Sequence, residues 1–167
     1  MTKTFDDLQA AFAGESQANR KYLAFAKKAD AEGYPQIARL FRAAAAAETV
    51  HALNHFRALD GVSTTSDNLK AAIEGENYES VTMYPDFIKD AEAESMKRAL
   101  NTFKWAWEVE KIHEALYRKA LTSLEAQQPV QEVEYYVCPT CGFTHEGPFE
   151  GPCPICKTLG EKFERIS

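Results

Sequence analysis

Two glutamate–histidine pairs interrupt otherwise apolar helical stripes in this 167-residue sequence. The first pair is Glu48 and His51, in the alanine-rich segment AAAAAETVHALNH, and the second is Glu110 and His113. Residues three apart lie on one face of a helix, so each pair can reach a common point. An unpaired charge in a core costs several kcal/mol, a large part of the stability of a domain, so each pair needs a partner or must lie outside the core.

Apolar residues recur three and four positions apart in the first part of the chain, which predicts amphipathic helices. We expect a first helix over residues 4–32, ended by Gly33. A second helix is expected from Pro35 to about Asp60, with Gly61 as its stop signal.

The same periodicity predicts two further helices. The third begins near residue 67, and Pro85 is expected to kink or break it near Tyr84. The fourth starts after Ser95, its predicted N-cap, and continues to about Ala126. Four amphipathic helices joined by short turns predict a mainly α fold, a four-helix bundle over residues 1–130.

Each predicted helix carries at least one glutamate on its apolar stripe: Glu15, Glu48, Glu76 with Glu79, and Glu110. Five carboxylates and two imidazoles in one core would repel one another unless cations lay between them. This is the ligand pattern of a di-iron or di-manganese carboxylate bundle. A single Glu-x-x-His on an alanine-rich helix is more often a solvated pair, but two such motifs with inward glutamates on the other helices favour a metal site. On the sequence alone, Tyr22 and Tyr84 can be simple packing aromatics.

The four cysteines all fall in the last part of the chain, with the spacing C-x2-C-x11-C-x2-C. In a reducing compartment such knuckles indicate a four-thiolate metal site, for zinc or for a single iron, and not disulfides. The spacing alone favours zinc. Because so short a segment cannot bury enough apolar surface, we expect residues 131–167 to form a separate small domain built around its metal.

Charge and hydropathy limit the possible partners. The net charge is −6 and no run of Lys or Arg stands out, which disfavours nucleic acid and anionic membranes as partners. No apolar stretch is long enough to span a membrane, and the N-terminus lacks the apolar region of a secretory signal. We therefore expect a cytoplasmic protein.

The motifs AFAGESQA, ETVH, GENYES, MYPDF and VEKIHE, followed by the paired C-x-x-C knuckles, resemble the rubrerythrin family over nearly the whole chain. The resemblance implies a ferritin-like bundle with a non-haem di-iron centre, followed by a rubredoxin-like domain with one iron. It also implies reduction of hydrogen peroxide, with NAD(P)H as the electron source through a separate reductase or a rubredoxin. The residues that match the family's iron ligands are Glu15, Glu48, His51, Glu76, Glu79, Glu110 and His113, with Cys138, Cys141, Cys153 and Cys156 for the single iron.

The resemblance also implies catalytic roles. Tyr22 and Tyr84 match tyrosines that hydrogen-bond near the irons, and Glu79 and His51 match a glutamate and a histidine between which one iron moves on reduction. Glu79, released from iron, or the tyrosine hydroxyls could supply protons for cleavage of the O–O bond. Lys157 follows the second knuckle where rubredoxins usually have glycine, which predicts a different loop there.

Two other functions compete with a peroxidase. The bundle could be a ferroxidase that handles iron in the manner of ferritin, but storage has no need of an attached one-electron carrier. The chain could also be a zinc-ribbon adaptor on a helical bundle, which leaves five inward glutamates unexplained.

The link between the second and third helices predicts the assembly. In the ferritin-like bundle that the resemblance implies, these helices are parallel, so the chain must return over roughly 18 Å and 14 Å of helix measured from the metal layer. The link GVSTTS reaches only about 23–25 Å when fully extended. Either the helix order differs from the family, or the chain forms a domain-swapped homodimer. In that dimer, Glu15, Glu48 and His51 of one chain meet Glu76, Glu79, Glu110 and His113 of the other.

Overall fold

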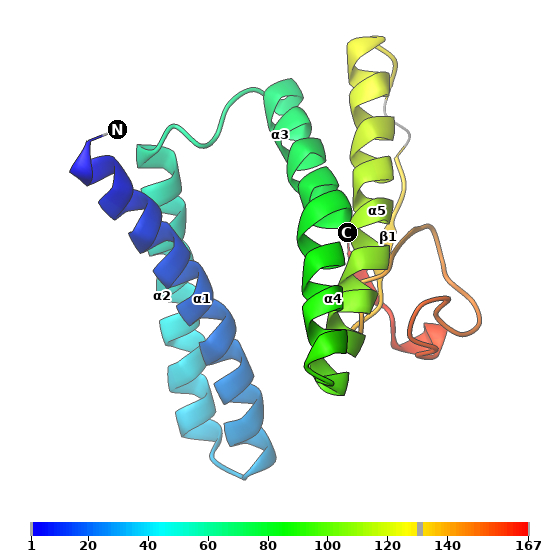
Figure 1. Ribbon diagram of the computed structural model, residues 1–167. Coiled ribbons are helices and arrows are strands. Elements are labelled where there is room, and N and C mark those ends of the chain that lie inside the picture. Colours follow the sequence, from blue (N-terminus) through cyan, green and yellow to red (C-terminus); the bar gives the residue numbers. More distant parts are fainter. Residues whose placement is uncertain (1, 130–131, 167) are drawn as a thin grey trace. The chain divides into compact units, whose positions relative to one another are not determined.

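The computed structural model describes residues 2–129 and 132–166 (Figure 1). The chain divides into two units, the first ending at Ser63 and the second beginning at Thr64. Over the described residues, no helix combines the length and the apolar character that a membrane crossing requires. The predicted boundary at residues 130 and 131 lies outside the described residues, and the division there stays a prediction.

The first unit is a hairpin of two long helices, α1 (Lys3–Ala31) and α2 (Pro35–Ala58) (Figure 1). Small side chains let the two backbones approach closely, and Ala26, Ala29 and Ala38 form the buried contact. Asn19 of α1 donates a hydrogen bond to the Ala45 carbonyl of α2 at 2.7 Å. The hairpin therefore has a thin core of alanines, as expected from the alanine-rich sequence.

Helix α2 ends two residues earlier than predicted, and its stop differs from the predicted one. Asp60, with φ of 54°, has the left-handed conformation that was expected for glycine. The amide of Gly61 donates to the Phe56 carbonyl at 3.0 Å, and a Cβ on Gly61 would overlap the Phe56 ring. Gly61 is thus required for close approach to an aromatic ring and not for a positive φ.

The second unit begins with one continuous helical segment whose middle turn is wider than an α-helix. It comprises α3 (Thr65–Tyr78), the π-helical turn η1 (Glu79–Met83) and α4 (Tyr84–Ala93). Pro85 was predicted to kink or break this helix near Tyr84; the helix does not break there, but it departs from α-helical geometry in the π turn directly before Tyr84. In η1 the Tyr84 amide bonds to the Glu79 carbonyl, five residues back, and Pro85 then falls in the first turn of α4, where its missing N–H is tolerated.

The π turn leaves one carbonyl without a main-chain donor. Ser80 would accept from Tyr84 in an α-helix, but that N–H is bonded to Glu79, and Pro85, one residue further on, has no N–H. Trp107 of the neighbouring helix supplies the missing donor, because its indole Nε1 donates to the Ser80 carbonyl at 2.7 Å. The tryptophan is therefore a hydrogen-bond donor as well as apolar mass.

The long helix α5 (Lys97–Glu125) packs against this segment within the second unit. The prediction of Ser95 as its N-cap is wrong, because Ser95 has φ of 57° and closes the preceding helix instead. The Met96 amide donates to the Ala91 carbonyl at 2.9 Å in this closure, and Met96 itself is the N-cap of α5.

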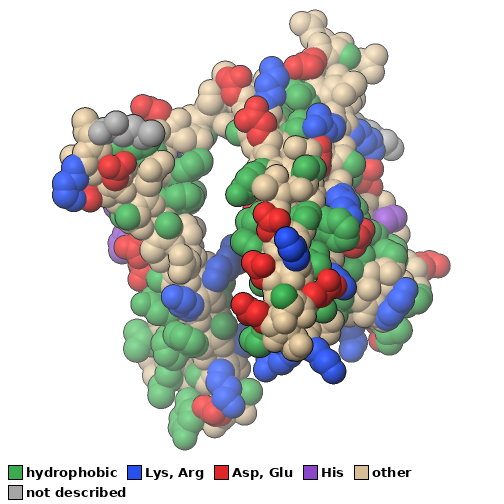
Figure 2. Space-filling view, viewed as in Figure 1, with side chains coloured by type: hydrophobic (Ala, Val, Ile, Leu, Met, Phe, Trp, Pro, Cys, Tyr) green, Lys and Arg blue, Asp and Glu red, His purple; other side chains and the backbone are tan. Residues whose placement is uncertain are grey.

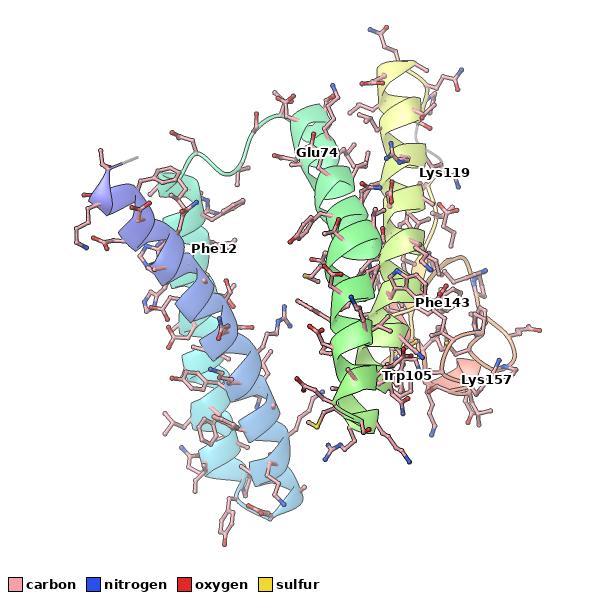
Figure 3. All side chains as sticks on the ribbon, viewed as in Figure 1. Phe12, Glu74, Trp105, Lys119, Phe143 and Lys157 are labelled. Carbon is pink, nitrogen blue, oxygen red and sulfur yellow. The ribbon has the colours of Figure 1, made fainter. Side chains whose placement is uncertain are left out.

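The C-terminal part is a small antiparallel sheet with the strand order β2-β1-β3. Its strands are β1 (Tyr135–Val137), β2 (Thr144–Glu146) and β3 (Glu164–Ile166), and the short helical turn η2 (Gly160–Lys162) precedes the last. Phe143 lies beside α5 (Figure 3), where it packs in one core with Val109. This part of the chain therefore shares its core with α5.

Candidate metal centres

The first unit brings three predicted ligands together, which we call the first triad: Glu15 of α1 with Glu48 and His51 of α2. One ligand atom from each lies within 4.8 Å of the others. His51 Nδ1 is 2.8 Å from Glu48 Oε2, as the spacing of three on a helix predicts. The His51 side chain is 54% exposed, so the first triad opens on the surface of its hairpin.

The second unit repeats the pattern in a second triad, made of Glu76 of α3 with Glu110 and His113 of α5. His113 Nδ1 lies 2.8 Å from Glu110 Oε2 and 3.7 Å from Glu76 Oε1. The His113 side chain is 27% exposed, half the exposure of its counterpart in the first triad. Each unit thus presents one glutamate from one helix and a Glu-x-x-His pair from the next, which is half of a dimetal carboxylate site.

The titratable groups of the second triad lie close enough together to shift one another's pKa values. Burial and the nearby Glu110 carboxylate raise the pKa of Glu76 to about 7. The hydrogen bond to Glu110 raises the pKa of His113, against the opposing effect of burial. Without a metal, the cluster thus favours holding protons, and a divalent cation would relieve the same repulsion. The donor set of carboxylates and imidazole fits iron or manganese.

Two predicted site residues lie near the second triad although they are outside its closest group. Burial, followed by the charge of Glu110, raises the pKa of Glu79 in η1. Burial also raises the pKa of Tyr84, with the charge of Glu79 as the next cause. A hydroxyl and a further carboxyl therefore accompany the second triad.

Tyr117 is a neighbour of the second triad that the sequence reading did not select. Burial and the charges of Glu76 and Glu110 raise its pKa. Its spacing of four residues after His113 was the available signal. The predicted Tyr22, by contrast, lies between the rings of Phe25 and Phe41, with centroids 6.3 and 6.2 Å away.

The four cysteines are free and their sulfurs form one cluster. Cys138 and Cys156 have their Sγ atoms 3.5 Å apart, and Cys141 and Cys153 have theirs 3.6 Å apart. Four metal–sulfur bonds of about 2.3 Å in a tetrahedron have sulfur–sulfur edges of about 3.8 Å. The cluster therefore fits a tetrahedral ion held by four thiolates, either zinc or iron.

The two knuckles share one backbone hydrogen bond and a residue of positive φ at the same position. The Gly142 amide donates to the Cys138 carbonyl, and the Lys157 amide donates to the Cys153 carbonyl, both at 3.0 Å. Gly142 has φ of 86° and Lys157 has φ of 66°, so lysine adopts the left-handed conformation here. The lysine takes this conformation at the cost of local backbone strain. The prediction that the loop differs from that of rubredoxins stays a prediction.

The pKa values of Cys141 and Cys156 are shifted in opposite directions. Burial raises the pKa of Cys141. Burial also acts to raise the pKa of Cys156, but hydrogen bonds from Thr158 and from the neighbouring thiols outweigh it and lower that pKa to about 6. A cation in the cluster would hold all four as thiolates.

The four-cysteine cluster and the second triad lie on adjacent faces of α5. Val109 packs against Cys138, Cys153 and Phe143, while Glu110, the next residue, belongs to the second triad. In addition, His113 Nε2 lies 3.0 Å from the Thr144 hydroxyl of β2. Thr144 was not predicted as a site residue, and nothing in its local sequence marks it.

Comparisons with known proteins agree with this geometry. A family model described as Rubrerythrin matches residues 6–121. The chain is 37% identical to Rubrerythrin-2 of Clostridium acetobutylicum, over 96% of this chain and 95% of the relative. It is 36% identical to Nigerythrin of Nitratidesulfovibrio vulgaris, over 92% of this chain and 81% of the relative.

A solved structure of nigerythrin, in its fully reduced, all-ferrous state, superposes with a TM-score of 0.58 at 34% identity. The match covers 99% of this chain and 88% of that chain. Together with the four-cysteine cluster, it confirms the predicted fold class, a ferritin-like four-helix bundle followed by a rubredoxin-like domain.

Proposed function

The chain belongs to the rubrerythrin family, and we propose that it is a peroxidase that reduces hydrogen peroxide to water with electrons passed from the four-cysteine iron to a di-iron centre. The family's iron cofactors match the carboxylate–histidine triads and the four-cysteine cluster. The observation that carries the proposal is the contact of the second triad with the rubredoxin-like domain across α5. A one-electron carrier beside a dimetal site suits a redox enzyme.

The ligand assignment is part of the proposal. The di-iron centre takes both triads together with Glu79, and the single iron takes the four cysteines. When bound, the two irons supply the two electrons that, with two protons, convert one hydrogen peroxide to two waters. Tyr84 and Glu79 lie beside the second triad, where a hydroxyl and a carboxyl can deliver those protons. Tyr22 belongs to the first unit, on α1 with Glu15, and we assign it the corresponding role there.

Glu79 and His51 are proposed to exchange as ligands of one iron on reduction. Carboxylates suit ferric iron, whereas a neutral imidazole suits ferrous iron. Replacing a negative ligand by a neutral one as the metal loses a positive charge keeps the local charge nearly constant. This limits the electrostatic cost of electron transfer in a site of low dielectric.

The electron donor is proposed to be a separate NAD(P)H-dependent reductase or a rubredoxin, acting on the four-cysteine iron in the cytoplasm. The alternative functions are less well supported. A ferroxidase for iron storage makes no use of the contact between the second triad and the cysteine domain. A zinc-ribbon adaptor leaves both triads without a role.

Metal analysis with a visible spectrum of the purified protein tests the function. We expect iron at all three sites, the red colour of ferric thiolate, and oxidation of the anaerobically reduced protein by hydrogen peroxide. A colourless zinc protein that peroxide does not oxidise contradicts the proposal. Deposition of a ferric mineral on addition of ferrous iron and oxygen, with no response to peroxide, points to the ferroxidase instead.

We further propose that the protein is a domain-swapped homodimer. Glu48 lies about 15 Å of helix before the end of α2 at Ala58, and Glu76 lies about 17 Å after the start of α3 at Thr65. A parallel α2 and α3 within one chain therefore need a return of about 32 Å, but residues 59–64 span at most about 25 Å. The four helices of one ferritin-like bundle are then two hairpins from different chains.

The surfaces of the hairpins support this assembly. Figure 2 shows hydrophobic side chains on the surface of both units, and among the exposed large hydrophobic residues are Leu40 at 66%, Val50 at 56% and Val81 at 66%. Each unit also holds only half of the ligand set of a dimetal site. A second copy supplies both the apolar cover and the missing ligands.

A further inference from the structure

We propose that Thr144 is a positioning residue that fixes the His113 imidazole and connects the four-cysteine site to the di-iron site within one chain. The inference rests on the proposed function, because it concerns the path by which the electrons arrive. It adds a residue that lies in neither ligand set and that comes from the rubredoxin-like domain.

The hydrogen bonds of Thr144 determine which nitrogen of His113 carries a proton. Thr144 Oγ1 donates to the Gly142 carbonyl at 3.0 Å. A hydroxyl has one proton, so toward His113 Nε2, 3.0 Å away, Thr144 can only accept. His113 must therefore carry a proton on Nε2, whether or not Nδ1 also donates one to Glu110.

This arrangement leaves the other nitrogen for the metal. His113 Nδ1 points to Glu110 and Glu76, the other members of the second triad. With Nε2 held by Thr144, Nδ1 is the nitrogen whose proton a cation would displace, and it faces the point where the three ligands converge. A hydrogen bond from the second ring nitrogen is the usual means by which proteins orient a histidine ligand.

The same contacts form a bonded route between the two metal sites. Gly142 follows Cys141 directly, so covalent bonds lead from the Cys141 sulfur to the Gly142 carbonyl. Hydrogen bonds then join that carbonyl to the Thr144 hydroxyl and the hydroxyl to His113. Val109 and Phe143 pack beside the route and cover it with apolar side chains.

Each transfer moves one electron. With iron bound, the electron would leave an ion held by the four cysteines and arrive at an ion held by the second triad. No covalent bond is formed or broken, and hydrogen peroxide is the final oxidant. In the swapped dimer, the four-cysteine site of a chain then serves the di-iron site to which its own α5 contributes.

Thr144→Val tests the role, because valine keeps the shape of the side chain but lacks the hydroxyl. The fully reduced protein is mixed with an excess of hydrogen peroxide, so that the di-iron site can accept electrons again after its first oxidation, and the rise of the ferric thiolate colour reports electron transfer between the sites. We expect Thr144→Val to slow this rise by about 10–100-fold at unchanged iron content. Thr144→Ser, which restores the hydroxyl, should return it to near the wild-type rate. Thr102→Val on the exposed side of α5 is the matched control and should leave the rate unchanged.

Nitrogen NMR of His113 in zinc-substituted protein gives a readout that does not depend on activity. We expect the Nε2-protonated tautomer in the wild type and in Thr144→Ser, and a changed Nε2 proton signal in Thr144→Val. An unchanged transfer rate and an unchanged histidine signal in Thr144→Val would overturn the inference. If the wild-type protein is not oxidised by peroxide at all, the proposed function fails, while the NMR comparison still decides the role of Thr144.

Discussion

The two triads have the same ligand types at the same spacing, yet their surroundings differ. The first triad lies on a hairpin whose buried contact is made of alanines, and its histidine is 54% exposed. The second triad lies beside a π turn, and its histidine is held from its far side by Thr144. The comparison teaches that Glu-x-x-His brings a carboxylate and an imidazole together in both units, whereas the packing around the motif decides which triad contacts the four-cysteine domain.

Removing a ligand of the four-cysteine site is expected to give the largest difference between the two units, because it affects only the second unit. In Cys138→Ser, the small domain loses a metal site whose binding free energy is on the order of 10 kcal/mol. We expect the red colour to disappear and the amides of β1 to β3 to lose protection in hydrogen exchange, while α1 and α2 remain protected. Persistent protection of the strands would show that the domain folds without its complete metal site.

Trp107→Phe is expected to lower the stability of the second unit only, because that unit contains the π turn. The substitution leaves the Ser80 carbonyl, in a residue that is 7% exposed, without its donor. We expect a loss of about 1–3 kcal/mol in the free energy of unfolding, measured by urea denaturation. Trp105→Phe is the matched control on the same helix, and an equal loss in both variants would mean that indole packing, and not the hydrogen bond, is responsible.

The smallest expected effect compares the two knuckles. Lys157→Gly removes a side chain from a backbone with φ of 66° and should stabilise the metal-bound domain by about 1 kcal/mol. Gly142→Ala should have the opposite sign, because its Cβ would meet only Val109 at an ordinary 3.8 Å and backbone strain alone remains. The rate of metal release to a chelator measures both, and faster release from Lys157→Gly would contradict the explanation.

The local pattern of the sequence was sufficient for the helices and for bringing the residues of each triad together. Periodicity placed the four helical segments, and the spacing of three brought each Glu-x-x-His pair together. The errors arose where the outcome depends on a hydrogen bond to a distant residue or on a choice between neighbours. Pro85 does not break its helix because a π turn frees the chain from needing its N–H, and Ser95 closes one helix where it was expected to begin the next.

The contacts of the second triad could not be predicted from spacing. Thr144 lies 31 residues from His113 in the sequence, and Trp107 lies 27 residues from Ser80. Both contacts depend on how separate elements pack, and a threonine or a tryptophan has many structural uses. By contrast, the four cysteines were predictable because two knuckles leave few alternatives.

The central claim is that each di-iron site joins the first triad of one chain to the second triad of another. It is tested most directly by refolding Glu48→Ala chains together with Glu110→Ala chains and measuring peroxide reduction. In a swapped dimer, each heterodimer has one intact site, so we expect recovery of roughly a quarter of the wild-type activity from two inactive variants at random pairing.

A double variant, Glu48→Ala with Glu110→Ala, is the control, because its heterodimers with the wild type are expected to show the opposite result. Refolded with the wild type, it should form heterodimers with no intact site if the dimer is swapped, and with one intact site if each site is built within a chain. Recovery by the two single variants together with inactive wild-type heterodimers is the predicted result. Proven heterodimers of the single variants that stay inactive, with active heterodimers of the wild type and the double variant, would contradict the account.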